Sequence, residues 1–188
     1  MIKIGILGDI GSGKSYVAKN FGYPVFNADT EVDKLYKKNK KVFNKLKKIL
    51  PKYIYSFPIN KNEISKAILV NQLNLKRIIK IVHPEIRKSM NIFLKKNKNE
   101  KIVILDIPLL LENKIDKGTT LVFVQSKKLD IKKRLKKRKN FNLELLNKFK
   151  KVQLPLDYKK KKSHFIIKNN FTKKTVKRDI KNILKEIL

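Results

Sequence analysis

The feature that most constrains this chain is a glycine-rich segment, Gly8 to Ser15, which directly follows an apolar run. It reads Gly-Asp-Ile-Gly-Ser-Gly-Lys-Ser and fits the pattern G-x-x-x-x-G-K-[ST] in full. Glycines let the backbone turn its N–H groups toward phosphate oxygens, and the helix that begins at about Ser15 adds its positive N-terminal end. Because strand, loop and helix follow in the right order, we favour a triphosphate-binding loop over a glycine-rich turn in an unrelated α/β protein.

The pattern also assigns roles to individual positions of this loop. We expect Lys14 to reach the β- and γ-phosphates and Ser15 to place its hydroxyl on Mg²⁺. Tyr16 is expected to contribute only its backbone N–H. The residues expected to bind the phosphates are Gly8, Gly11, Ser12, Gly13, Lys14, Ser15 and Tyr16.

Apolar, β-branched runs recur along the chain with helical segments between them. Continuous apolar runs of this kind are typical of parallel strands that are covered on both faces. The sequence therefore predicts an α/β fold with a five-stranded parallel sheet flanked by helices. The predicted strands are Lys3 to Leu7, Pro24 to Asn27, Lys101 to Ile107, Thr120 to Gln125 and Phe165 to Ile167.

Two strand-free stretches predict how the 188 residues are organised around this sheet. Residues 30–98 carry apolar residues at helical spacing and predict a helical substrate-binding insertion. Residues 127–164 predict two very basic helices that form a lid, as in small-molecule kinases that must exclude water. The nucleotide-binding core is then expected to span residues 1–29 and 99–188, with Thr172 to Leu188 as a closing helix.

The formal net charge of +33 raises the alternative of a nucleic-acid-binding protein. Only five of the 48 basic residues are arginines, although arginine is the usual residue for planar, bidentate recognition of bases and phosphates. We therefore favour compositional lysine bias together with an anionic substrate, and expect no specific nucleic-acid partner. The lysine clusters at 132–139 and 159–162 are expected to be solvated helix faces.

Other classes of protein are disfavoured by what the sequence lacks. The absence of cysteine excludes disulfides and thiol chemistry, and with two histidines we expect no dedicated metal centre. No apolar run approaches the roughly 20 residues of a membrane span, and the N-terminal run resembles a buried strand more than a signal peptide. We expect a cytoplasmic, monomeric protein with no membrane partner.

Two aspartates follow predicted strands and are candidates for chemistry. Asp29 comes just after a strand, where open parallel sheets bind ligands, and would accept the proton of an attacking hydroxyl. Its alternative role is to cap the helix that begins near Thr30. Asp106 ends another strand and would hold a Mg²⁺-bound water, with strand-end hydrogen bonding as the alternative.

The chain resembles the dephospho-coenzyme A kinase family in the order and spacing of several blocks. The matching blocks are Gly8 to Ser15, Asn27 to Asp29, His83 to Arg87, Val103 to Glu112, Arg134 with Arg138, Gln153 to Leu156 and Phe165 to Asn169. They span nearly the whole chain, and although the first is generic, the set at these separations is specific.

This resemblance implies transfer of the γ-phosphate of ATP to the ribose 3′-hydroxyl of dephospho-coenzyme A, giving coenzyme A and ADP. It implies Asp29 as the general base, residues 30–98 as the acceptor domain, and Arg134 and Arg138 as catalytic lid arginines. The alternative for either arginine is a solvated helix charge. Another small-molecule kinase, acting on a nucleotide, is the alternative function.

His83 and Arg87 stand four residues apart, at what we expect to be the start of a helix. This spacing puts both side chains on one face, where they would bind the phosphates of the acceptor. For His83 the alternative is a local hydrogen bond to the turn around Pro84.

The sequence departs from the pattern of the family at a few positions. Asp9 stands where a second glycine is usual and brings a negative charge near the phosphates, unless it faces away. Lys168 and Phe171 replace an aspartate and a glycine, which puts the geometry of the adenine-side loop in question. His164 occupies a position that is often aspartate, and we assign it no role.

Overall fold

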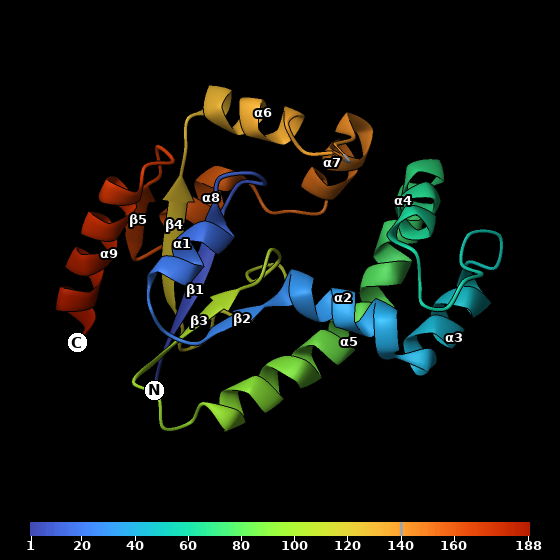
Figure 1. The fold of residues 1–188 in the computed structure, drawn as a ribbon, viewed down its shortest axis with the longest axis horizontal. Helices are drawn as coiled ribbons and strands as arrows, with labels where there is room; N and C mark the ends of the chain where they lie inside the picture. Colours follow the sequence, from blue (N-terminus) through green and yellow to red (C-terminus); the bar gives the residue numbers. More distant parts are fainter. Residues whose placement is uncertain (140) are drawn as a thin grey trace. The chain divides into compact units, whose positions relative to one another are not determined.

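The computed structural model describes residues 1–139 and 141–188. Its contacts divide the chain into two compact units (Figure 1). The sheet unit consists of Met1–Asn27, Asn97–Phe141 and Gln153–Leu188, and the helical unit consists of Ala28–Lys96 and Asn142–Val152.

A parallel five-stranded sheet forms the centre of the first unit, so the predicted fold class is confirmed. Its strands are β1 (Ile2–Gly8), β2 (Val25–Asn27), β3 (Ile102–Asp106), β4 (Thr120–Gln125) and β5 (Phe165–Lys168). They are arranged in the order β2-β3-β1-β4-β5. The glycine-rich loop therefore leaves the middle strand at the carboxyl edge of the sheet, where open α/β folds bind ligands.

Successive side chains of each strand point to opposite faces of the sheet, so every second residue packs against the helices on the same face. The side chains of Ile4, Ile104 and Val122 are buried with α1 (Lys14–Asn20) and α9 (Lys173–Ile187) in one core cluster. A further helix, α8 (Leu156–Lys161), contacts β1. Because both faces of the sheet carry buried residues, the strands read as continuous apolar runs rather than as alternating ones.

The helical unit is built around one long helix. Its helices are α2 (Ala28–Lys38), α3 (Lys40–Ile49), α4 (Lys61–Val70), α5 (Gln72–Lys96) and α7 (Leu143–Lys150). Helix α5 contacts α2, α3 and α4, and buries Leu75, Ile78, Val82, Ile86 and Met90 at helical spacing.

Residues 127–164 differ from the two helices predicted for them. The described part of this stretch holds three, α6 (Lys128–Lys136), α7 and α8. Residues 142–152 belong to the helical unit and not to the core segment, because Gln72 Nε2 donates to the Lys148 carbonyl at 3.0 Å and Lys148 Nζ donates to the Leu69 carbonyl at 2.6 Å. In the residues that are described, no helix has the length and apolarity needed to span a membrane.

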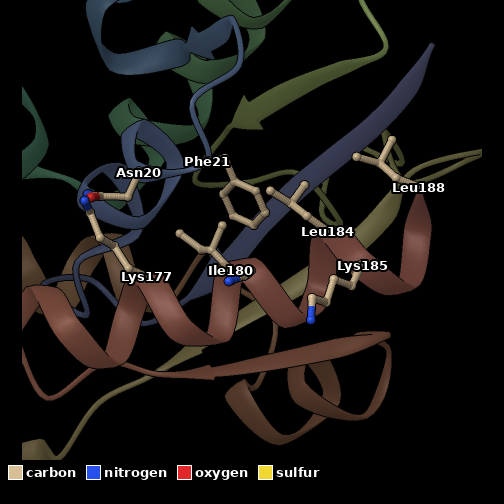
Figure 2. Close-up of a pocket in the computed structure, with 8 residues that line it drawn as sticks. Asn20, Phe21, Lys177, Ile180, Leu184, Lys185 and Leu188 are labelled. Atoms are coloured by element: carbon tan, nitrogen blue, oxygen red, sulfur yellow. The ribbon is translucent and has the colours of Figure 1, made fainter.

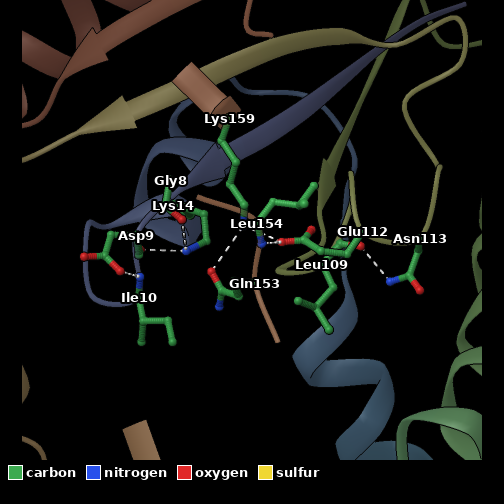
Figure 3. A network of polar contacts seen from close by, with 10 residues as sticks. All are labelled: Gly8, Asp9, Ile10, Lys14, Leu109, Glu112, Asn113, Gln153, Leu154 and Lys159. Carbon is green, nitrogen blue, oxygen red and sulfur yellow. Dashed lines mark hydrogen bonds and ion pairs between the residues drawn. The ribbon is translucent and has the colours of Figure 1, made fainter. Parts of the chain in front are cut away.

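Lys159 contradicts the expectation that its cluster is a solvated helix face, since its side chain is only 1% exposed. Its ammonium group lies 2.8 Å from Glu112 Oε1 and donates to Gln153 Oε1 at 3.2 Å (Figure 3). Glu112 Oε1 also accepts the N–H of Leu154 at 2.8 Å. This buried ion pair thus joins α8 to the segment after β3 that contains Glu112, and Glu112 also holds the segment just before α8.

We predict that Lys159→Met lowers the free energy of unfolding by about 3–5 kcal/mol, because it leaves the Glu112 carboxylate buried without its cation. Urea denaturation followed by circular dichroism measures this loss. Lys160→Met is the matched control, since that neighbouring side chain is exposed, and should change stability by less than about 0.5 kcal/mol. Equal effects of the two substitutions would contradict the assigned ion pair.

Candidate active site

The glycine-rich loop is fixed from two sides by residues distant in sequence. Gly11 and Gly13 have φ angles of 89° and 93°, in the left-handed region that glycine adopts without steric cost. A Cβ atom on Gly11 would lie 3.0 Å from Leu135 of α6, and one on Gly13 would lie 2.3 Å from Asn169 Nδ2. Side chains at either position would therefore displace the elements that pack on the loop.

Lys14 begins α1 and reaches back over the loop. Its Nζ donates to the carbonyl oxygens of Asp9 at 2.8 Å and Gly8 at 3.2 Å (Figure 3). The Asp9 carboxylate accepts the N–H of Ile10 at 2.7 Å and lies on the opposite side of its residue from the Lys14 ammonium. The Asp9 carboxylate thus bonds the backbone of its own loop.

The carboxyl ends of β2 and β3 are joined by side chains. Asn27 and Asp106 are register partners, and Asn27 Nδ2 donates to Asp106 Oδ2 at 2.6 Å. This is the strand-end hydrogen bond of Asp106 that was considered from the sequence. The Asp106 residue is only 3% exposed. Among residues 1–139 and 141–188, no group of three or more His, Cys, Asp or Glu side chains is placed to hold a metal ion.

The two arginines that were expected to belong to a lid lie in different local settings. Arg134 is on α6, and its guanidinium stacks 4.2 Å from the centroid of the Phe171 ring. Arg138 lies in the turn after that helix and is exposed. Phe171 has a φ of 64°, so its backbone keeps the conformation that glycine favours.

The remaining predicted site residues belong to the helical unit. Asp29 lies in the first turn of α2, which begins at Ala28, so it does not occupy the cap position before the helix. His83 and Arg87 lie in the middle of α5 and not at the start of a helix. Pro84 misled the sequence interpretation, because proline is common in the first turn but here stands inside a helix that continues on both sides of it.

Three residues next to β4 and β5 make structural bonds that the sequence did not assign to them. Ser126 follows β4 and Asn169 follows β5, and both side chains donate to the Ser12 carbonyl, at 2.9 and 2.8 Å. His164 bonds with both backbone groups of Leu121, accepting at Nδ1 and donating from its own N–H, each at 2.9 Å. Only the place of Ser126 and Asn169 after predicted strands signalled that these two residues lie near the loop.

A surface groove of about 650 Å³ lies elsewhere, between α1 and α9 (Figure 2). Phe21, Ile180 and Leu184 line it together with lysines of α9. Its residues come from the far end of α1, and none of the predicted site residues lines it. The groove is therefore separate from the candidate active site.

Comparison with known proteins supports one family. A model of the dephospho-CoA kinase family matches residues 2–175. A protein of Wolbachia pipientis wMel named dephospho-CoA kinase is 35% identical over 187 residues, covering 96% of this chain and 95% of its own length.

Solved structures show the same fold. The protein TT1252 from Thermus thermophilus is 26% identical with a TM-score of 0.76, covering 100% of this chain and 98% of its own. The dephospho-CoA kinase from Campylobacter jejuni is 22% identical with a TM-score of 0.67, covering 98% and 96%.

We predict that Gly13→Ala weakens binding of a nucleoside triphosphate at least about tenfold, equivalent to about 1.4 kcal/mol, because the new methyl group collides with Asn169 and distorts the loop. Isothermal titration calorimetry measures the affinity. Gly22→Ala is the control, since Gly22 has a φ of 78° but nothing within 4 Å of its Cβ position. It imposes the same backbone strain without a collision, and equal losses of affinity would show that the contact with Asn169 is irrelevant.

Proposed function

Because this chain belongs to the dephospho-CoA kinase family, we propose that it transfers the γ-phosphate of ATP to the ribose 3′-hydroxyl of dephospho-coenzyme A. The products are coenzyme A and ADP. The observation that carries the proposal is a complete phosphate-binding loop on the central strand of a chain that matches the family over residues 2–175.

The loop is proposed to hold the donor. Its backbone N–H groups from Gly8 to Tyr16 bind the phosphates, and Lys14 neutralises charge on the group that is transferred. Lys14 already lies within hydrogen-bonding distance of two loop carbonyls, so it needs only to exchange these acceptors for phosphate oxygens.

Mg²⁺ is the proposed cofactor, with Ser15 and Asp106 as the residues that would hold it. A hydroxyl and a buried strand-end carboxylate are oxygen ligands of the kind that Mg²⁺ takes, alongside phosphates and water. The bond from Asn27 occupies Oδ2 of Asp106 and orients the carboxylate. The ion would neutralise charge on the phosphates as they react.

Asp29 is the proposed general base, and His83 and Arg87 are proposed to bind the acceptor. Asp29 lies in the first turn of α2, at the positive end of the helix, and a carboxylate can accept the hydroxyl proton. Arg134 and Arg138 are proposed to bind the phosphates of ATP. Arginine suits this role because its planar guanidinium binds phosphate in a bidentate manner.

An acceptor panel tests the reaction. With ATP and Mg²⁺, we expect purified protein to phosphorylate dephospho-coenzyme A and to leave shikimate and nucleoside monophosphates unchanged, as measured by ADP release and product mass. If dephospho-coenzyme A is inert and a nucleotide reacts, the chain is a nucleotide kinase. Tight duplex binding that persists at physiological salt would instead favour a nucleic-acid-binding protein.

A second prediction tests the base. Asp29→Asn should leave the Kd for ATP within about twofold but lower kcat by about 10²- to 10⁴-fold, the usual contribution of general acid–base catalysis. Asp33→Asn, on the same helix and paired with Lys61 at 2.6 Å, is the control and should retain turnover. Near-normal kcat for Asp29→Asn would exclude this residue as the base.

A further inference from the structure

The Ser12 carbonyl oxygen receives two hydrogen bonds from outside its own loop. Asn169 Nδ2 donates to it at 2.8 Å and Ser126 Oγ donates at 2.9 Å. Ser12 and Asn169 are 1% and 2% exposed. These bonds therefore form away from bulk water, where they are strong and where losing one is costly.

The orientation of the Asn169 side chain is determined by a second bond. Its Oδ1 accepts the N–H of Phe171 at 2.9 Å, so the other end of the amide, Nδ2, must face Ser12. The backbone N–H of Asn169 donates to the Gln125 carbonyl at 2.8 Å, which fixes the residue against the end of β4. Asn169 is thus held in place before it contacts the loop.

Because the peptide bond is planar, the two hydrogen bonds to the Ser12 carbonyl also set the direction of the N–H group of the next residue. In a trans peptide the C=O of one residue and the N–H of the next point in opposite directions. Two donors hold the Ser12 carbonyl toward the ends of β4 and β5, so the N–H of Gly13 points away from them. We infer that Asn169 and Ser126 are positioning residues that turn the Gly13 N–H toward the phosphates.

This inference rests on the proposed role of the loop as the site for the phosphates of ATP. The side chains of Asn169 and Ser126 act through one peptide group and need not touch the nucleotide. Their effect should therefore appear with any ligand that carries the phosphates, whether or not it carries adenosine. Inorganic tripolyphosphate, which has phosphates but no adenosine, is therefore the probe that separates binding of the phosphates from binding of the nucleoside.

Three variants separate the contributions. Asn169→Asp keeps the acceptor for Phe171 but places an oxygen against the Ser12 carbonyl, and Ser126→Ala removes the other donor. Ser126→Thr retains the hydroxyl and should bind ATP and tripolyphosphate as tightly as the unsubstituted protein does. Asn170→Asp is the charge control, because Asn170 is exposed and its side chain bonds Thr172, not the loop.

We expect Ser126→Ala and Asn169→Asp each to raise the Kd for both ATP and tripolyphosphate about three- to tenfold, as for loss of one hydrogen bond. Calorimetric titration measures both ligands, and thermal unfolding checks that each variant is folded. Weaker binding of ATP with unchanged binding of tripolyphosphate would overturn the inference and assign Asn169 to the nucleoside side. Unchanged binding of both ligands by Ser126→Ala would also overturn it.

The same titrations remain informative if the proposed reaction is wrong, because they need no acceptor. If the unsubstituted protein does not phosphorylate dephospho-coenzyme A, the proposed function is refuted and the positioning inference is not. Failure of the positioning inference would appear as unchanged affinity for tripolyphosphate in Ser126→Ala or in Asn169→Asp.

Discussion

The sheet unit depends on holding one loop, Gly8 to Ser15, in a single backbone arrangement. Helix α6 packs on Gly11 and Asn169 packs on Gly13, so the loop is fixed by segments more than 100 residues away in sequence. The parallel sheet makes this possible, because it brings the carboxyl ends of β1, β4 and β5 to one edge.

Lysine side chains on the surface of the protein and in its interior are stabilised in different ways. Most of the lysine surplus lies on exposed helix faces, where water screens it and single ion pairs contribute little. Lys159 is buried and is accompanied by Glu112, because an unpaired ammonium group would carry a large desolvation cost. The net charge of +33 therefore describes the composition of the surface more than the chemistry of the site.

The elements that follow local patterns could be predicted from the sequence, and those that depend on distant partners could not. Apolar runs indicated all five strands, and glycine spacing indicated the phosphate-binding loop, because each is encoded within a few residues. Nothing local shows that Asn169 contacts Ser12 or that α7 joins the helical unit through Gln72 and Lys148. Pro84 was misinterpreted for a related reason, since burial of α5 on both sides of it outweighs the local preference.

Phe171 shows how a departure from the family pattern is accommodated. At a φ of 64° a side chain costs about 1–2 kcal/mol relative to glycine, yet the backbone path is the one that glycine would take. The N–H of Phe171 still donates to Asn169, so the amide that reaches the phosphate-binding loop stays oriented. The ring in turn stacks on the Arg134 guanidinium, and a cation–π contact of this kind contributes about 0.5–1 kcal/mol at an exposed site. The substitution thus retains the geometry of the loop after β5, and part of its strain is offset by a contact that restrains an arginine of α6.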